Sequence, residues 1–249
     1  MTDTDRLVLP GNAAWIETIL NEPRVTVAYR SPRLCVLVCV RPRPDAPWRE
    51  EAGAWTRMFE RTYIAPLSDD IERGRLVAAF FDWLGERYGQ EIEPGRNQAC
   101  YEFLFDHAQL LRNGSACSSL LDIGCGPGTI LKTRLPARVP LIQGYDISDE
   151  VRDAAHASGL HVMTTNEFLE GRRNFAVALS AYVMHYACDM DETLNAVARH
   201  LEPEGIWVMN FHKKINASLL MSRLPGTALS LAGEPQDSAF GLVVTVITR

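Results

Sequence analysis

The second half of the chain alternates between two hydrophobic patterns. Short apolar runs, bounded by glycine, asparagine and aspartate, are followed by stretches in which apolar positions recur at helical spacing. Strands joined by such helices form a parallel sheet with right-handed crossovers. Asp189 and Glu192 have the spacing of a capping box at the start of one helix. The patterns predict strands near 119–123, 140–146, 160–164, 175–180 and 206–211, and helices near 128–135, 149–158, 190–201 and 215–223.

The end of the chain departs from this alternation. Two apolar runs, 227–231 and 242–247, are separated by a loop instead of a helix. A strand reached without a crossover helix pairs antiparallel with its neighbour. We therefore predict that the last strand of the sheet is antiparallel.

The first 95 residues follow a third pattern. Two β-rich runs flank the turn signal Arg30-Ser-Pro-Arg33, and aromatic residues then recur at helical spacing. We expect residues 1–95 to form a cap, or lid, over the substrate site and residues 96–249 to form a second domain. The elements expected before the sheet are a hairpin over 25–29 and 34–40 and helices over 13–20, 48–63, 77–88 and 96–111.

A glycine-rich loop follows the first strand of the second domain. Residues 120–128 read Leu-Leu-Asp-Ile-Gly-Cys-Gly-Pro-Gly, with glycine at 124, 126 and 128. Glycine permits positive φ and a close approach of the backbone to a ligand. Asp122 is a carboxylate at the end of an apolar strand, which is costly unless a polar or cationic group meets it. A strand, a glycine loop and a helix form the nucleotide-cofactor site of α/β proteins.

The spacing of the glycines argues against a dinucleotide. The dinucleotide pattern needs glycine at the position of Thr129, whereas this chain has it one residue earlier, at Gly128. Asp146 ends the next strand, where a carboxylate accepts both ribose hydroxyls of an adenosine and repels a ribose phosphate. Alternatively, Asp146 or Ser148 only caps the following helix. We favour an adenosine cofactor over NAD(P).

Four stretches together resemble the class I S-adenosylmethionine-dependent methyltransferase family. They are residues 120–128, 144–148, 175–186 and 201–210. The resemblance covers about residues 96–249 and implies a Rossmann-like α/β fold, with a seven-stranded, mostly parallel sheet and an antiparallel last strand. The N-terminal α+β cap segment expected over residues 1–95 lies outside the resemblance. The chain departs from the family at two positions where the family often has aspartate. One is Ala176, and the other follows the third strand, in residues 164–167.

The resemblance implies S-adenosylmethionine as the cofactor, with S-adenosylhomocysteine as its product. Asp122 would hold the cofactor's ammonium through water, Asp146 would accept the ribose hydroxyls, and Ile147 would pack on adenine. The set of cofactor-binding residues implied in this way is Asp122, Gly124, Cys125, Gly126, Gly128, Asp146, Ile147, Asn166, Ser180 and Ala181.

Methyl transfer from a sulfonium is an in-line displacement, so the protein mainly positions the acceptor. A base is needed only when the acceptor must lose a proton. His185, just beyond the fourth strand, is the candidate base, and the alternative is that it only packs against the loop. Tyr101, His107 and Tyr186 are candidates for contacts with the substrate. We expect His156 and His200 to lie on solvated helix faces.

Composition narrows the choice of partner. The chain has 249 residues, 47% of them hydrophobic, and a formal net charge of −6, so it lacks the basic footprint of a nucleic-acid binder. Its longest apolar run, 34–40, is too short to span a bilayer. The six cysteines lack CxxC pairs, and the first residues lack an apolar signal region. We expect a cytoplasmic protein with reduced thiols, no metal site and no membrane or nucleic-acid partner.

These observations predict methyl transfer to a small, hydrophobic or aromatic metabolite of the natural-product type. A hydroxyl acceptor is favoured if His185 is the base, while nitrogen and carbon acceptors remain open. A homodimer is one assembly that the sequence leaves open. The alternative function is an S-adenosylmethionine-binding protein that catalyses a rearrangement or cyclisation without methyl transfer, or that regulates a partner enzyme.

Overall fold

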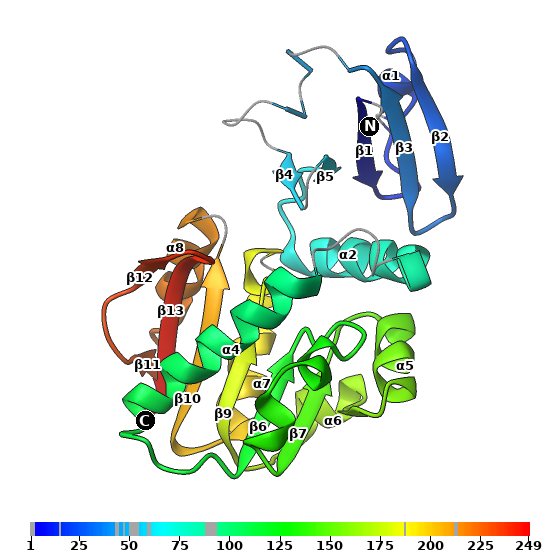
Figure 1. The fold of residues 1–249 in the computed structure, drawn as a ribbon. Helices are drawn as coiled ribbons and strands as arrows, with labels where there is room; N and C mark the ends of the chain where they lie inside the picture. Colours follow the sequence, from blue (N-terminus) through cyan, green and yellow to red (C-terminus); the bar gives the residue numbers. More distant parts are fainter. Residues whose placement is uncertain are drawn as a thin grey trace. The chain divides into compact units, whose positions relative to one another are not determined.

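A computed structural model of the chain shows two compact units, Met1–Leu84 and Gly85–Arg249, each described here by itself (Figure 1). The boundary between the two units lies after Leu84, at the end of a helix and inside the segment expected to form the cap. The expectation that residues 1–95 cover the substrate site stays a prediction. The residues that the structure describes are 3–14, 16–42, 45–46, 48–49, 55–58, 61–87, 94–186, 188–211 and 214–249.

The first unit contains a sheet in the order β2-β3-β1-β5-β4. The predicted hairpin is confirmed, because β2 pairs antiparallel with β3. Strand β1 was not expected, and it joins the hairpin to β5. The elements of this unit are β1 (Thr4–Leu9), α1 (Ile16–Leu20), β2 (Val25–Arg30), β3 (Cys35–Val40), β4 (Thr56–Arg57), β5 (Thr62–Ile64) and α2 (Asp70–Leu84).

The helix predicted over residues 48–63 is wrong where the structure describes it. Thr62 and Ile64 are buried on one face of β5, which pairs parallel with β1. Trp48 is buried too, and its indole Nε1 donates a hydrogen bond of 2.9 Å to Asp5 on β1. Trp48 and Tyr63, two of the aromatic residues at helical spacing, therefore pack against the sheet of the first unit instead of forming one face of a helix. Positions 50–54 and 59–60 of the predicted helix lie outside the described residues.

The second unit is built on a sheet in the order β11-β13-β10-β9-β6-β7-β8, with β12 paired to β13. Strands β10, β9, β6, β7 and β8 are mutually parallel, and β13 runs antiparallel to β10, as predicted. Its elements are η1 (Gly85–Arg87), α4 (Pro94–Leu111), β6 (Ser119–Ile123), η2 (Thr129–Lys132), η3 (Leu135–Ala137), β7 (Leu141–Tyr145), α5 (Asp149–Ala157), β8 (His161–Val162), α6 (Thr165–Glu170), β9 (Phe175–Ser180), η4 (Met184–Tyr186), α7 (Met190–His200), β10 (Leu201–Phe211), α8 (Lys214–Arg223), β11 (Leu229–Leu231), β12 (Gln236–Ser238) and β13 (Gly241–Thr248).

Helices cover both faces of this sheet, which is why its central strands read as continuous apolar runs (Figure 1). Side chains of β6 alternate between the two faces. Leu120 packs in one core with Leu104 and Phe105 of α4. Leu121 packs in the other core with Leu194 of α7. Among the described residues, none of the helices has both the length and the hydropathy that crossing a bilayer requires.

Three local predictions about the second unit are wrong. The glycine loop leads into two short 3-10 helices instead of an α-helix over 128–135. The Asp189 side chain does not cap α7, because this residue has a left-handed backbone with φ 41°. A capping box forms instead between Thr164 and Glu167, at the start of the unexpected α6. His200 is fully buried, whereas His156 is exposed as expected.

Candidate active site

The glycine loop lies at the carboxyl edge of the sheet, where parallel strands of α/β proteins bind ligands. Gly124, Gly126 and Gly128 have φ values of 71°, 54° and 80°, a region that favours glycine. The amides of Gly124 and Cys125 donate to the carbonyl of Tyr145 at 2.7 and 3.0 Å. A Cβ on Gly124 would lie 2.2 Å from the Val183 side chain. The loop is thus fixed to β7 and passes close beneath the residues that follow β9.

Cys125 fills a tight turn. Its side chain is fully buried, and a Cβ built on Gly144 would lie 2.8 Å from the Cys125 Cβ. Burial raises the pKa of the Cys125 thiol well above its usual value, with the Asp146 charge acting in the same direction. Because the thiolate is the reactive form of cysteine, this side chain is placed for packing and not for nucleophilic attack.

Asp122 is fully buried at the end of β6. Within the part of the chain that the structure describes, neither of its carboxylate oxygens has a hydrogen-bond partner. Burial raises the pKa of this carboxyl well above its usual value. The Asp146 charge adds to the shift and the Tyr101 hydroxyl opposes it. A buried carboxylate without a partner is costly, so this position fits a ligand that brings a cation.

Asp146 ties the glycine loop to the end of β7. One of its oxygens accepts the Gly126 amide at 3.0 Å, and the other accepts the Ser148 amide at 3.1 Å. Burial raises the pKa of Asp146, and these hydrogen bonds lower it. The Ser148 hydroxyl caps α5 by accepting the Val151 amide. Since a carboxylate oxygen accepts more than one hydrogen bond, Asp146 can bind the loop and two ribose hydroxyls together.

The remaining residues of the expected cofactor set lie around the same edge. Ile147 is half-buried, and Asn166 is exposed in the first turn of α6. Ser180 is fully buried, and its hydroxyl accepts a hydrogen bond of 3.0 Å from the Trp207 indole. The Ser180 side chain is therefore engaged within the core, which leaves its backbone and that of Ala181 to meet a ligand.

The structure brings together only some of the expected catalytic and substrate residues. His185 is buried in η4, with its ring centroid 4.1 Å from that of Tyr186. Tyr101 is buried on α4 on the same side of the sheet as Asp122. His107 lies elsewhere, with its Nε2 atom 3.2 Å from the Thr245 hydroxyl on β13. Strands β9 and β10 separate β13 from β6, so His107 is not beside Asp122.

Tyr182 and Asn210 are features of the edge that sequence reasoning missed. Tyr182 follows β9 with a φ of 61°, which is rare for a bulky side chain. Its amide donates to Oδ1 of the fully buried Asn210 at 2.7 Å, and Asn210 donates to the Phe240 carbonyl at 2.8 Å. Arg96 donates to the Tyr182 hydroxyl at 3.2 Å. A polar residue ending the apolar strand β10 was the sequence signal for Asn210.

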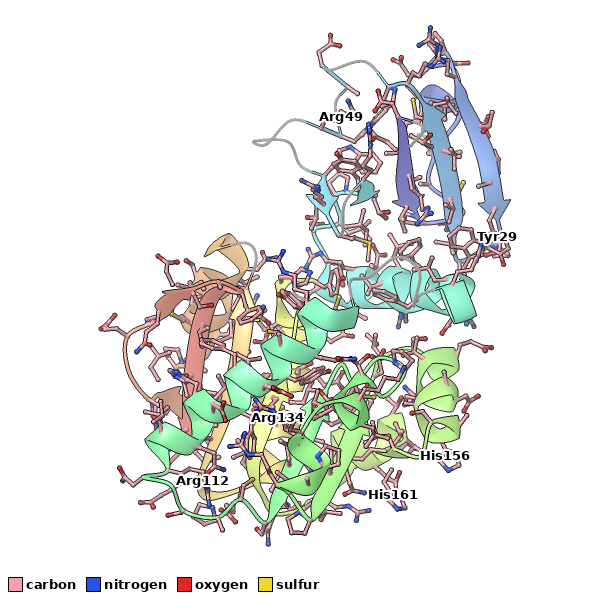
Figure 2. All side chains as sticks on the ribbon, viewed as in Figure 1. Tyr29, Arg49, Arg112, Arg134, His156 and His161 are labelled. Atoms are coloured by element: carbon pink, nitrogen blue, oxygen red, sulfur yellow. The ribbon has the colours of Figure 1, made fainter. Side chains whose placement is uncertain are left out.

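Helix α4, which carries Arg96 and Tyr101, is fastened across the sheet by ion pairs. Arg112 near its C-terminal end lies 3.3 Å from Glu202, and Arg134, in the turn after η2, lies 2.6 Å from Glu102 (Figure 2). The second pair links α4 to the segment that continues the glycine loop.

A family model and several solved structures are similar to this chain. The family model described as "Methyltransferase domain" matches residues 79–223, more than half of the chain. The chain is similar to magnesium protoporphyrin IX methyltransferase from Synechocystis PCC 6803 with bound S-adenosylhomocysteine. That likeness has a TM-score of 0.52 and 15% identity, and it covers 73% of this chain and all (100%) of that one.

Two further solved structures give weaker likenesses. One is the S-adenosylmethionine-bound amino pentose methyltransferase of calicheamicin biosynthesis from Micromonospora echinaspora, with a TM-score of 0.48, 13% identity, and coverage of 62% of this chain and 94% of that one. The other is DesVI from Streptomyces venezuelae, with a TM-score of 0.48, 16% identity, and coverage of 70% and 98%. The curated proteins gave no match.

Proposed function

The chain belongs to the class I S-adenosylmethionine-dependent methyltransferase family, and from that premise we propose that it methylates a small, hydrophobic or aromatic metabolite of the natural-product type. The observation that carries this proposal is the aromatic character of the carboxyl edge, where Tyr101, Tyr182 and Tyr186 lie around the glycine loop and η4. The net charge of −6 further disfavours a nucleic acid as acceptor.

The acceptor is inferred from this chain's own residues. The relative from Synechocystis acts on magnesium protoporphyrin IX, but at 15% identity that likeness shows the fold alone. Small apolar acceptors fit an edge whose side chains away from the two carboxylates are largely aromatic, with Tyr101, Tyr182 and Tyr186.

We propose that the carboxyl edge holds the cofactor as the sequence predicts. When bound, the cofactor supplies a methyl group already activated on a sulfonium, so the protein's task is to hold an acceptor in line with it. The orphaned carboxylate of Asp122 fits the ammonium, and the anchored carboxylate of Asp146 fits the ribose hydroxyls. Ile147 and Asn166 would contact adenine, and the Ser180 and Ala181 backbone would meet the methionine part.

We propose His185 as the general base for a hydroxyl acceptor, which would make the reaction an O-methylation. Its buried ring lies on the loop after β9 and against Tyr186. An imidazole has a pKa suited to proton transfer near neutral pH. Tyr182 and Arg96 would line the acceptor side of the same loop. A neutral amine attacks before it loses a proton, so with such an acceptor His185 would only pack.

The test is transfer of a labelled methyl group. The full chain is incubated with methyl-labelled S-adenosylmethionine and a fractionated extract that contains metabolites, protein and nucleic acid. We expect label in small, extractable, apolar products, and we expect Asp146→Ala to reduce it while Asp149→Ala, at an exposed position of α5, does not. Label in protein or nucleic acid would contradict the proposed acceptor class.

A cofactor-binding protein that does not transfer methyl groups is the alternative, and the same experiment decides it. Bound, unconsumed S-adenosylmethionine with no labelled product in any fraction would favour a rearrangement, a cyclisation or regulation of a partner. A homodimeric assembly stays a prediction.

A further inference from the structure

Among the described residues, Asp122 differs from the other fully buried aspartate, Asp5. Asp5, in the first unit, accepts hydrogen bonds from Trp48, Arg49 and Arg61. Asp122 is equally buried, yet among the residues that the structure describes neither of its oxygens has a partner at hydrogen-bond geometry, and only the Tyr101 hydroxyl lies where it favours the ionised form. A carboxyl group in such a place is either protonated, and so uncharged, or ionised and paired with a cation that a ligand brings.

The ionisable groups around Asp122 do not supply that cation. Tyr101 faces it from α4, Asp146 from the end of β7 and Cys125 from the glycine loop. Burial keeps the Cys125 thiol protonated by raising its pKa, and the charge of Asp146 disfavours a second negative charge nearby. The Tyr101 hydroxyl alone acts to lower the pKa of Asp122, and its effect is smaller than that of burial.

We propose that Asp122 carries a proton in the cofactor-free protein and releases it to solvent when a ligand with an α-ammonium binds beside it. The carboxylic O–H bond breaks, its electron pair stays on the carboxylate, and the proton passes to the buffer. The ammonium keeps its own protons and supplies the positive charge that this site lacks. In a low-dielectric interior such a pair stabilises the ionised carboxylate strongly.

This proton release would link recognition of the cofactor to pH. Below the raised pKa of Asp122, binding must expel a proton, so affinity increases as the pH rises. The increase ends at that pKa, and affinity falls where the ligand's own α-amino group loses its proton, near a pKa of about 8. Asp122 would also discriminate between S-adenosylhomocysteine, which carries the ammonium, and 5′-methylthioadenosine, which lacks it. The inference rests on the proposed role of Asp122 at the ammonium.

Titration calorimetry of the full chain tests the proposal. S-adenosylhomocysteine is titrated at pH 6.5 in several buffers that differ in ionisation enthalpy. For release of about one proton per ligand, the observed enthalpy falls with buffer ionisation enthalpy along a slope of about −1. In the same wild-type protein, 5′-methylthioadenosine gives a slope near zero. This comparison of two ligands needs no variant and is independent of any folding defect.

Two matched variants assign the proton to a residue. Asp122→Asn keeps the shape of the side chain and cannot titrate, so its slope with S-adenosylhomocysteine falls to zero and its affinity no longer rises between pH 5.5 and 7. Asp146→Asn weakens binding but keeps the slope. Tyr101→Phe removes the group that lowers the pKa of Asp122, so proton release persists to higher pH.

The possible outcomes distinguish failure of the proton release from failure of the proposed cofactor site. A slope of zero in the wild-type protein, with binding intact, overturns the proton release and leaves the cofactor site standing. A slope that survives in Asp122→Asn and disappears in Asp146→Asn would mean that the proton comes from Asp146. That result would also overturn proton release by Asp122. If neither variant changes the affinity for S-adenosylhomocysteine, the proposed site itself fails.

Discussion

Asn210 shows how one buried side chain shapes the carboxyl edge. Its carbonyl oxygen accepts the amide of Tyr182, and its amide donates to the carbonyl of Phe240. The first bond holds Tyr182 at a positive φ, and the second ties the end of β10 to the turn before β13. Strained residues of this kind persist only where their surroundings determine them.

We predict that Asn210→Ala destabilises the protein by about 1–3 kcal/mol, because two partly buried backbone groups lose their partners. Asn210→Asp keeps the acceptor for Tyr182 but buries a carboxylate against the Phe240 carbonyl, so it should cost at least as much. Urea unfolding of both variants measures the difference. A loss for Asn210→Ala within about 0.5 kcal/mol, as for an ordinary surface substitution, would show that the bridge contributes little.

His200 belongs to a buried aromatic stack. Its ring lies 5.7 Å from that of Phe168, which stacks in turn at 3.9 Å on Tyr145, the residue before Asp146. Its Nε2 atom is 2.8 Å from the Phe168 carbonyl. Burial lowers the pKa of His200, and the hydrogen bond opposes this only partly. The folded protein therefore disfavours the protonated ring.

This shift predicts the direction of acid destabilisation. Since the unfolded chain binds the proton more readily, the stability from His200 is fully present above an unfolded pKa of about 6.5 and is lost as the pH falls below it. His200→Gln should flatten the fall in unfolding free energy between pH 6.5 and 5, whereas His156→Gln, at an exposed position, should not. Equal slopes for wild type and His200→Gln would contradict the assignment.

At the scale of elements, the first unit is held by a buried carboxylate. Asp5 on β1 accepts hydrogen bonds from Trp48, from Arg49 and from Arg61, which precedes β5. These contacts join segments more than forty positions apart in the chain. Asp3 pairs with the same arginines but is half exposed.

We predict that Asp5→Ala costs about 3–5 kcal/mol, because it leaves buried donors without their charge partner. Asp3→Ala removes an exposed partner of the same arginines and should stay within about 1 kcal/mol. Most of the tryptophans lie in residues 1–84, so tryptophan fluorescence during urea unfolding reports on this unit. Equal losses for the two variants would mean that burial of Asp5 does not matter.

The elements that sequence predicted well are those whose hydrophobic pattern is local and complete. The parallel strands and the helices α5, α7 and α8 follow from runs buried on both faces and from amphipathic stretches. The helix over 48–63 failed because Trp48 is bound by Asp5, a partner too distant in sequence to be foreseen. Likewise, the positive φ of Tyr182 depends on Asn210 and leaves no local signal.

The sequence predicted the positions of some residues of the candidate site and missed the contacts of others. The glycine loop and Asp146 carry local signals, and the structure places them in contact. The placement of His107 against Thr245 depends on which strand α4 crosses, and the engagement of Ser180 by Trp207 depends on side-chain packing between β9 and β10. Neither feature is encoded by spacing along the chain.

For the whole molecule, the proposed cofactor site forms only because separate strands come together at one edge. Asp122 ends β6, Asp146 follows β7, and Tyr182 follows β9, where Asn210 of β10 holds it. The acceptor and the covering role of residues 1–95 remain proposals that build on this edge. Its capacity to bind the cofactor is therefore the central claim.

The most direct test is the dissociation constant of S-adenosylhomocysteine for the wild-type chain, Asp146→Ala and Asp149→Ala, with thermal unfolding confirming that each variant is folded. Loss of the charge-assisted hydrogen bonds to the ribose should weaken binding to Asp146→Ala by about 1–3 kcal/mol, or roughly 5- to 150-fold. Asp149→Ala should bind like the wild type. An unchanged dissociation constant for Asp146→Ala would contradict the account of the site.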